Sequence, residues 1–283
     1  SVIDNLVMVT GNAPFTPKVT YIANPSPQRI VLDITGVNFS DQLPTPVLGH
    51  EGFIVVDHPM IQQIRYSLFN PVLHTIRIVI DLKAKSDFKV IMDGTANIFA
   101  LEITEYKLKV VIDAGHGDGD PGAISITKRK EKDFNLAVAL KVKALLDQVE
   151  PIEASMTRSD DTFVTLDGRV EFANKWGADA FISIHGNYFT KTTAGTESFY
   201  WNENSKSFAE VMHTNLLLAT GFPDRKLQKN DFRVVKATKM PAVLLEVGFL
   251  SHAKEEILMY TPEFQDIVAQ SIVKGIKQYF NLT

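Results

Sequence analysis

The chain of 283 residues contains no cysteine. Disulfide bonds and thiolate metal sites are therefore excluded, and any bound metal must be held by histidine, aspartate or glutamate. Positive charge is also scarce, because 29 Lys and Arg residues stand against 33 Asp and Glu residues, for a formal net charge of −4. This balance argues against nucleic acid as a partner, since nucleic-acid binding usually needs a concentrated basic face.

Long uncharged apolar runs are missing as well, so the sequence predicts no membrane span. The first residues, Ser1-Val2-Ile3-Asp4, have neither the basic start nor the apolar segment of an export signal. Composition alone is therefore compatible with a chain whose signal was removed and with one that was never exported. What the chain does have is 45% hydrophobic residues, enough for one large core or two moderate ones.

The first hundred residues have the pattern of a β-rich domain. Short runs rich in β-branched residues are separated by turn residues, as in 29–37 and 75–82. In the second run isoleucine occupies every other position, which places Arg77 and Asp81 together on the opposite face. We predict an all-β, sandwich-like domain over residues 1–104.

From about residue 106, strands begin to alternate with helices. Phe134 and Val138 belong to an apolar stripe at helical spacing, and Gly177 is placed to end a second helix before an apolar strand. Residues 262–280 have the pattern of a closing helix. We predict an α/β domain over residues 105–283, with a mostly parallel twisted sheet flanked by helices.

Three apolar strands of this second domain end in a residue that can bind a metal or move a proton: His116, His185 and Glu246. The carboxyl ends of strands form the ligand crevice of open α/β sheets, so we expect the three to converge. A carboxylate in a buried strand, such as Glu246, is costly unless something compensates its charge. A zinc ion held by His116 and His185, with Glu131 as third ligand, would do so and would leave a fourth position for water.

Six blocks in the second domain, in order, resemble the zinc-dependent N-acetylmuramoyl-L-alanine amidases of the amidase-3 type. They are VVIDAGHGDGDPGA, KEKDFNLAVALKVKALL, MTRSDDTFVTLDGRVEFAN, ADAFISIHGN, GTESFYW and MPAVLLEVGFLS. This family cleaves the amide between N-acetylmuramic acid and the first alanine of the peptidoglycan stem peptide. The resemblance implies that His116, Glu131 and His185 bind Zn²⁺ and that Glu246 is the catalytic glutamate, acting as base and then as acid.

Further site residues are expected near the three ligands and Glu246. Asn187 and Arg225 are candidates for substrate binding, Asn187 with a turn-stabilising role as its alternative, and Arg225 through the carboxylates of the stem peptide. Asp113 is a candidate to orient the His116 ring, with capping of the glycine loop as its alternative role. Gly186 stands where the family often has alanine, and is expected to widen the pocket or loosen its neighbouring ligand.

Arg158 and Arg169 fall in the block that holds a loop to a helix in the family, and we expect structural roles for both. Some relatives insert an inhibitory helix over the zinc. The link between His185 and GTESFYW is short here, which predicts that no such plug is present.

The first domain resembles the AMIN module that precedes such amidases, with RIVLDITG and TIRIVIDL as the best-matching pieces. The module implies targeting, with peptidoglycan as the partner of both domains. A protein activator is compatible with this interpretation, and we expect a monomer. The implied location is extracytoplasmic, in the periplasm or the cell wall, with the export signal absent from this sequence.

Two other functions fit parts of this pattern. A zinc peptidase that trims stem peptides would use the same metal chemistry. A non-catalytic wall-binding or regulatory protein would keep the fold without turnover, but it would be expected to lose a ligand or the glutamate, and all four are present.

Overall fold

The computed structural model describes residues 1–23, 27–40, 43–47 and 49–282. The chain divides into two compact units, Ser1–Tyr106 and Lys107–Thr283. The described part of the first unit holds only strands: β1 (Val2–Ile3), β2 (Leu6–Thr10), β3 (Lys18–Ile22), β4 (Arg29–Thr35), β5 (Gly52–Ile54), β6 (Ile61–Asn70), β7 (Thr75–Leu82), β8 (Ser86–Asp93) and β9 (Ile98–Glu105).

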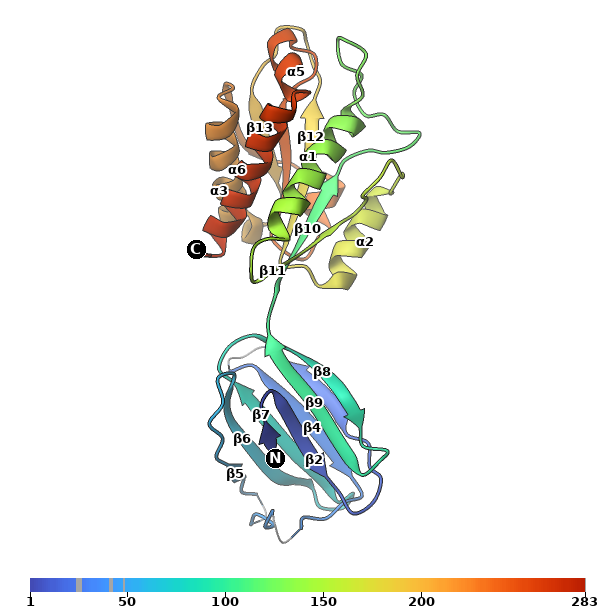
Figure 1. Cartoon of the computed structure of the whole chain (residues 1–283), viewed down its shortest axis with the longest axis vertical. Coiled ribbons are helices and arrows are strands. Elements are labelled where there is room, and N and C mark those ends of the chain that lie inside the picture. Colours follow the sequence, from blue (N-terminus) through green and yellow to red (C-terminus); the bar gives the residue numbers. More distant parts are fainter. Residues whose placement is uncertain (24–26, 41–42, 48, 283) are drawn as a thin grey trace. The chain divides into compact units, whose positions relative to one another are not determined.

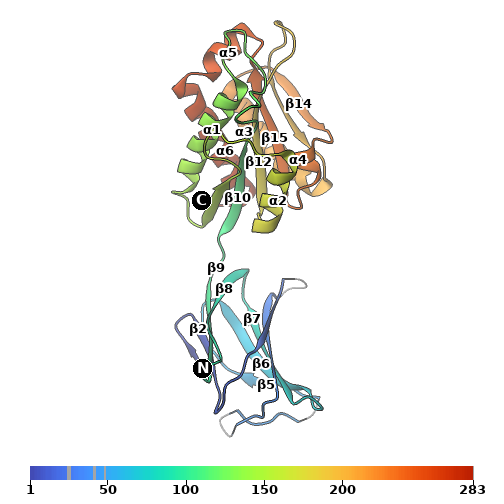
Figure 2. The same cartoon turned by 90° about the vertical axis from the view of Figure 1, so that its right-hand side faces the viewer.

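The strands of the first unit form two antiparallel sheets, visible in Figures 1 and 2, with the orders β1-β2-β9-β8 and β3-β4-β7-β6-β5. Side chains from both sheets meet in one core, which includes Leu32 and Ile80 from one sheet and Phe99 and Leu101 from the other. Alternate residues of β4 and β7 point into this core because successive side chains of a strand face opposite sides. The unit is therefore a β-sandwich.

The second unit alternates strands and helices. They are β10 (Leu108–Ala114), α1 (Glu131–Leu146), β11 (Ile152–Met156), α2 (Leu166–Trp176), β12 (Ala180–Asn187), β13 (Thr196–Tyr200), α3 (Glu203–Thr220), β14 (Asp224–Lys229), α4 (Arg233–Lys236), β15 (Ala242–Phe249), α5 (Ala253–Met259) and α6 (Pro262–Tyr279). As expected, Gly177 ends α2 in the left-handed conformation. No helix among the described residues is both long and apolar enough to cross a membrane.

The six strands of this unit form one sheet of order β11-β10-β12-β15-β13-β14, with helices on both faces (Figures 1 and 2). Helices α1, α3 and α6 pack in one core with residues such as Ile112 and Ile182, and α2 and α4 pack in the other with Val111 and Phe181. The strands are thus buried on both sides, as expected for an α/β sheet.

The prediction of a mostly parallel sheet is wrong, because the sheet is mixed. Strand β13 runs antiparallel to β15, whereas β12 and β15 are parallel. Only residues 188–195 connect β12 to β13. A parallel return needs a crossover of a dozen or more residues, so this short link forces the chain to reverse. The same link contains no helix, which agrees with the expected lack of an inhibitory insertion.

Candidate metal centre

Three neighbouring strands carry polar residues at the same level of the sheet. His185 on β12 pairs in register with Glu246 on β15, and Glu246 pairs with Glu197 on β13. Residues directly opposite each other on paired strands share a face of the sheet. Two acidic groups and a histidine are therefore lined up on one face near the carboxyl end of β12 and β15.

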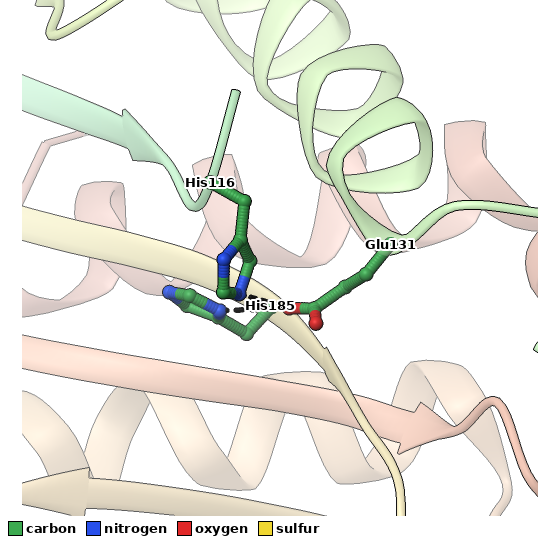
Figure 3. Close-up of side chains that lie close together, drawn as sticks. All are labelled: His116, Glu131 and His185. Atoms are coloured by element: carbon green, nitrogen blue, oxygen red, sulfur yellow. Dashed lines mark hydrogen bonds and ion pairs between the residues drawn. The ribbon is translucent and has the colours of Figure 1, made fainter. Parts of the chain in front are cut away.

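His116 and Glu131 join this row from the two ends of one long loop. His116 is the second residue after β10, and Glu131 is the first residue of α1 (Figure 3). The Glu131 Oε1 atom lies 3.2 Å from His116 Nε2 and 2.8 Å from His185 Nδ1. The three residues offer ligand atoms that all lie within 4.8 Å of one another. Donors of a tetrahedral zinc site are about 3.3 Å apart, so the cluster is compact enough to hold one ion.

Two glycines allow the side chains to come this close. A Cβ atom at Gly115 would lie 2.1 Å from His185 Cε1, and a Cβ at Gly122 would lie 2.6 Å from Glu131 Oε2. Gly122 also has a φ of +65°, which side chains rarely adopt. The loop backbone therefore forms part of the wall of the cluster, and larger residues would displace the candidate ligands.

The Glu131 carboxylate is held by the start of its own helix and by the loop. The backbone N–H of Ala123 donates to Oε2 at 2.8 Å, and Asn135 Nδ2 donates to Oε1 at 3.1 Å. Burial acts to raise the pKa of Glu131, but its hydrogen bonds with the two histidines outweigh burial and hold the pKa well below its usual range.

The pKa values of the two histidines shift upward, opposite to that of Glu131. Burial acts to lower the pKa of His116, but the hydrogen bond to Glu131 raises it to about 9, and the pKa of His185 is also raised against the effect of burial. A metal binds neutral imidazole. Metal binding at this cluster must therefore displace protons that the Glu131 carboxylate otherwise stabilises.

Asp120 was not anticipated from the sequence. Its Oδ2 atom lies 2.7 Å from His116 Nδ1, the ring nitrogen that does not face Glu131. A carboxylate in this position fixes the ring orientation and tautomer of a metal-binding histidine. The available signal was that Asp120 lies four residues after His116 in a glycine-rich loop. A tight loop of this kind can bring a carboxylate back onto the histidine ring.

Asp113, which was expected to orient His116, has another role. Its buried carboxylate accepts hydrogen bonds of 2.6 Å each from Thr157, Ser183 and Arg169. The residue still lies within β10, in register with Ser183, before the chain turns toward His116. Asp113 therefore ties β10 to its neighbours, and Asp120 takes the position at the histidine.

Arg158 and Arg169 have the expected structural roles. Arg158 donates to the carbonyls of Ala114 and Gly115 at 2.9 Å, and Arg169 donates to the carbonyl of His116 at 2.8 Å. Both guanidinium groups thus hold the backbone that carries the first histidine.

Glu246 differs from its acidic neighbours because one of its oxygens has no partner. Its buried Oε2 atom forms no hydrogen bond with the residues that the structure describes. Burial raises the pKa of Glu246 to about 7, with nearby Glu131 and Glu197 acting in the same direction. An unpaired buried carboxylate beside a His-Glu-His cluster fits a centre that receives a metal and a substrate, because the chain itself leaves that oxygen unsatisfied.

The expected role of Asn187 in substrate binding is not favoured by the structure. Its Nδ2 donates to Glu197 Oε1 at 2.5 Å, and its Oδ1 accepts from the N–H of Tyr188 at 2.7 Å. Both ends of the amide are used within the chain, so the turn-stabilising alternative fits better. Arg225, by contrast, is brought to the site, where its Nε donates to Glu197 Oε2 at 3.0 Å. Glu197 itself was missed by sequence analysis, although it lies in the GTESFYW block.

Gly186 does not widen the pocket. A Cβ atom there would lie 3.0 Å from Met259 Cε and 3.3 Å from Leu250 Cγ, both on the core side of the sheet. Residue 186 faces the core and not the face that carries its neighbour His185, so the contacts argue against a wider pocket, whereas the expected loosening of His185 stays a prediction.

Comparison with known families identifies both units. The model of the N-acetylmuramoyl-L-alanine amidase family, Amidase_3, matches residues 110–278. The AMIN domain model matches residues 7–112.

Individual relatives match the second unit. The probable cell wall amidase LytH of Staphylococcus saprophyticus is 39% identical over 175 residues, which cover 61% of this chain and 58% of that protein. The aligned segment is thus less than two thirds of that relative. The catalytic domain of CwlV, an N-acetylmuramoyl-L-alanine amidase from Bacillus (Paenibacillus) polymyxa, is 48% identical with a TM-score of 0.61, covering 62% of this chain and 99% of that one. The CwlD amidase of Clostridioides difficile, solved in complex with the GerS lipoprotein, is 30% identical with a TM-score of 0.59, covering 62% and 99%.

Proposed function

Because this chain belongs to the N-acetylmuramoyl-L-alanine amidase family, we propose that its α/β unit cleaves the amide between N-acetylmuramic acid and L-alanine in peptidoglycan. The observation that carries the proposal is the convergence of His116, Glu131 and His185 next to Glu246, whose Oε2 is unpaired. Two imidazoles and one carboxylate are the donor set of a hydrolytic zinc centre rather than of a closed structural one.

The three clustered residues would hold Zn²⁺, with Asp120 fixing the His116 ring. Bound zinc supplies a water of lowered pKa and polarises the scissile carbonyl. Glu246 accepts the proton of the attacking water and then delivers it to the departing alanine nitrogen, since an amide nitrogen that is not protonated is a poor leaving group.

The β-sandwich is proposed to hold cell-wall polymer and so to bring the catalytic unit to its substrate. The support is the AMIN match over residues 7–112, together with the amidase match that follows it. Peptidoglycan lies outside the cytoplasmic membrane, and we therefore propose that the protein acts there.

The test is mass spectrometry of purified peptidoglycan after digestion with the protein, with chelator, and with chelator followed by added zinc. We expect free stem peptides that begin with alanine, together with peptide-free glycan, only when metal is present. Shortened peptides that remain attached to muramic acid would identify a peptidase instead. Wall binding without any cleavage in the zinc-supplemented sample would identify a non-catalytic protein.

A further inference from the structure

The Arg225 side chain is held in place at the edge of the metal centre. Its Nε donates to Glu197 Oε2 at 3.0 Å, and its guanidinium carbon lies 5.1 Å from the centre of the Phe249 ring. Its aliphatic stem packs against Gly195, where a Cβ atom would lie only 2.7 Å from Arg225 Cγ. Two contacts from residues 195–197 and one from β15 therefore fix the side chain before any ligand arrives.

The outer half of the same guanidinium is available. Within the described residues, Nη1 and Nη2 of Arg225 donate no hydrogen bond, and the side chain is 41% exposed. The two Nη nitrogens of a guanidinium can donate hydrogen bonds to the two oxygens of a carboxylate. An arginine anchored through its stem and Nε, with its Nη atoms free, is arranged to receive a carboxylate from solution.

Glu197 links this arginine to the catalytic row. Its other oxygen, Oε1, accepts from Asn187 Nδ2 at 2.5 Å, so both carboxylate oxygens are used. The residue is only 6% exposed and pairs in register with Glu246 across β13 and β15. Removing the carboxylate would free Arg225 from its anchor while leaving its charge in place.

We propose that Arg225, positioned by Glu197, forms a subsite that selects substrates with a free carboxylate on the peptide side of the scissile amide. The inference rests on the proposed amidase function and adds a specificity to it. Arg225 is the residue that contacts the substrate, and Glu197 acts through it as a positioning residue.

The test uses two muramoyl peptides that differ only in whether the residue after alanine carries a carboxylate or a carboxamide. For the zinc-loaded protein with both units, we expect a KM about tenfold to a hundredfold lower for the carboxylate, with a similar kcat for both. Arg225→Gln should abolish this preference, and Arg225→Lys, which keeps the charge but not the planar fork, should retain part of it.

Glu197→Gln should reduce the preference at least threefold by raising KM for the carboxylate substrate. A purely structural role for Glu197 would instead lower turnover on both substrates equally and leave their ratio unchanged, which would overturn its assignment. Arg233→Gln and Glu203→Gln are matched controls, because each alters an exposed ion pair elsewhere on the unit. Both controls should keep the wild-type preference.

The wild-type comparison decides the inference even if a variant fails to fold. Equal KM values for the two substrates would overturn the carboxylate subsite while leaving the amidase function intact. Cleavage of neither substrate at the muramoyl amide would contradict the proposed function itself.

Discussion

One carboxylate on a central strand of each unit shows the contrast between a fully paired acidic group and one with an unpaired oxygen. In the β-sandwich, Asp81 on the central strand β7 is 1% exposed and accepts hydrogen bonds from Arg65 at 2.7 Å and Gln63 at 2.8 Å. In the α/β unit, Glu246 on the central strand β15 is left with an unpaired oxygen. Asp81 is thus compensated within the sandwich, as Asp113 is within the α/β unit, whereas Glu246 keeps one oxygen available for a ligand.

The difference indicates that Asp81 serves stability and that Glu246 serves the reaction. A buried polar atom without a partner costs about 1–3 kcal/mol, so the pairing in the sandwich is what stability alone would produce. The unpaired oxygen of Glu246 lies beside Glu131, His116 and His185, where a ligand would satisfy it. Four predictions test these separate roles, and they follow from the largest expected effect to the smallest.

The largest effect is expected for Glu246→Gln. The amide keeps the shape of the side chain but cannot take up a proton, so turnover should fall about 100-fold to 10,000-fold. Zinc content, measured by elemental mass spectrometry, should stay at the wild-type level because Glu246 is not one of the clustered ligands. A zinc-loaded variant with near-normal turnover would contradict the role of Glu246 as base and acid.

Asp81→Ala should affect stability and not turnover. Removing the Asp81 carboxylate takes away the partner of Gln63 and one of the two acidic partners of Arg65, which keeps its ion pair with Glu51. We expect a loss of about 1–3 kcal/mol in the free energy of unfolding of the sandwich. Denaturant unfolding followed by circular dichroism measures it. Both tryptophans, Trp176 and Trp201, lie in the α/β unit, so the midpoint of their fluorescence transition should not move. Lost turnover on a soluble muropeptide would refute this division of roles.

Asp120→Asn should weaken zinc binding about 10-fold to 100-fold, because the His116 ring loses its orienting carboxylate. Zinc titration with a competing chelator measures the affinity, and turnover should largely recover at saturating zinc. Asp118→Asn is the matched control, since Asp118 lies in the same loop and asparagine tolerates its positive φ of 46°. Equal affinities for the two variants would exclude a role for Asp120 at the metal.

The smallest effect is the acid sensitivity of the sandwich. Burial acts to raise the pKa of Asp81, but hydrogen bonds from Arg65 and Gln63 lower it below its ordinary value. A folded-state pKa below the unfolded one gives stability that is present above about pH 4 and is lost as pH falls through the folded value. Unfolding midpoints between pH 6 and pH 3 should therefore decline more steeply for the wild type than for Asp81→Asn. Parallel curves would show that Asp81 does not carry this dependence.

Much of the fold could be predicted from local patterns. The run 75–82 was recognised as a strand because isoleucine occupies alternate positions, and the structure places β7 at Thr75–Leu82. Strand β6 was missed because its register shifts between Ile61 and Gln63. The bulge moves the buried positions to Ile61, Ile64 and Tyr66, which breaks the two-residue period on which the recognition of strands depends.

The site likewise contains residues that local sequence patterns predicted and residues that they did not. His116, His185 and Glu246 were predicted from their positions at strand ends, because the direction of parallel strands brings those ends to one edge. Asp120 and Glu197 were missed, and the contacts of Asp113 and Gly186 differ from those expected, since each depends on where a side chain points after a turn or on an exact register.

The sequence by itself determined the alternation of strands and helices, the two-unit organisation expected from it, and the residue types available to hold a metal in a chain without cysteine. Only the tertiary structure decided the reversal of β13 and the network of Glu197 with Arg225 and Asn187, 28 and 10 residues away. The physical reason is that periodicity reports which face of an element is buried, whereas hydrogen bonds between distant residues depend on the path of the chain between them.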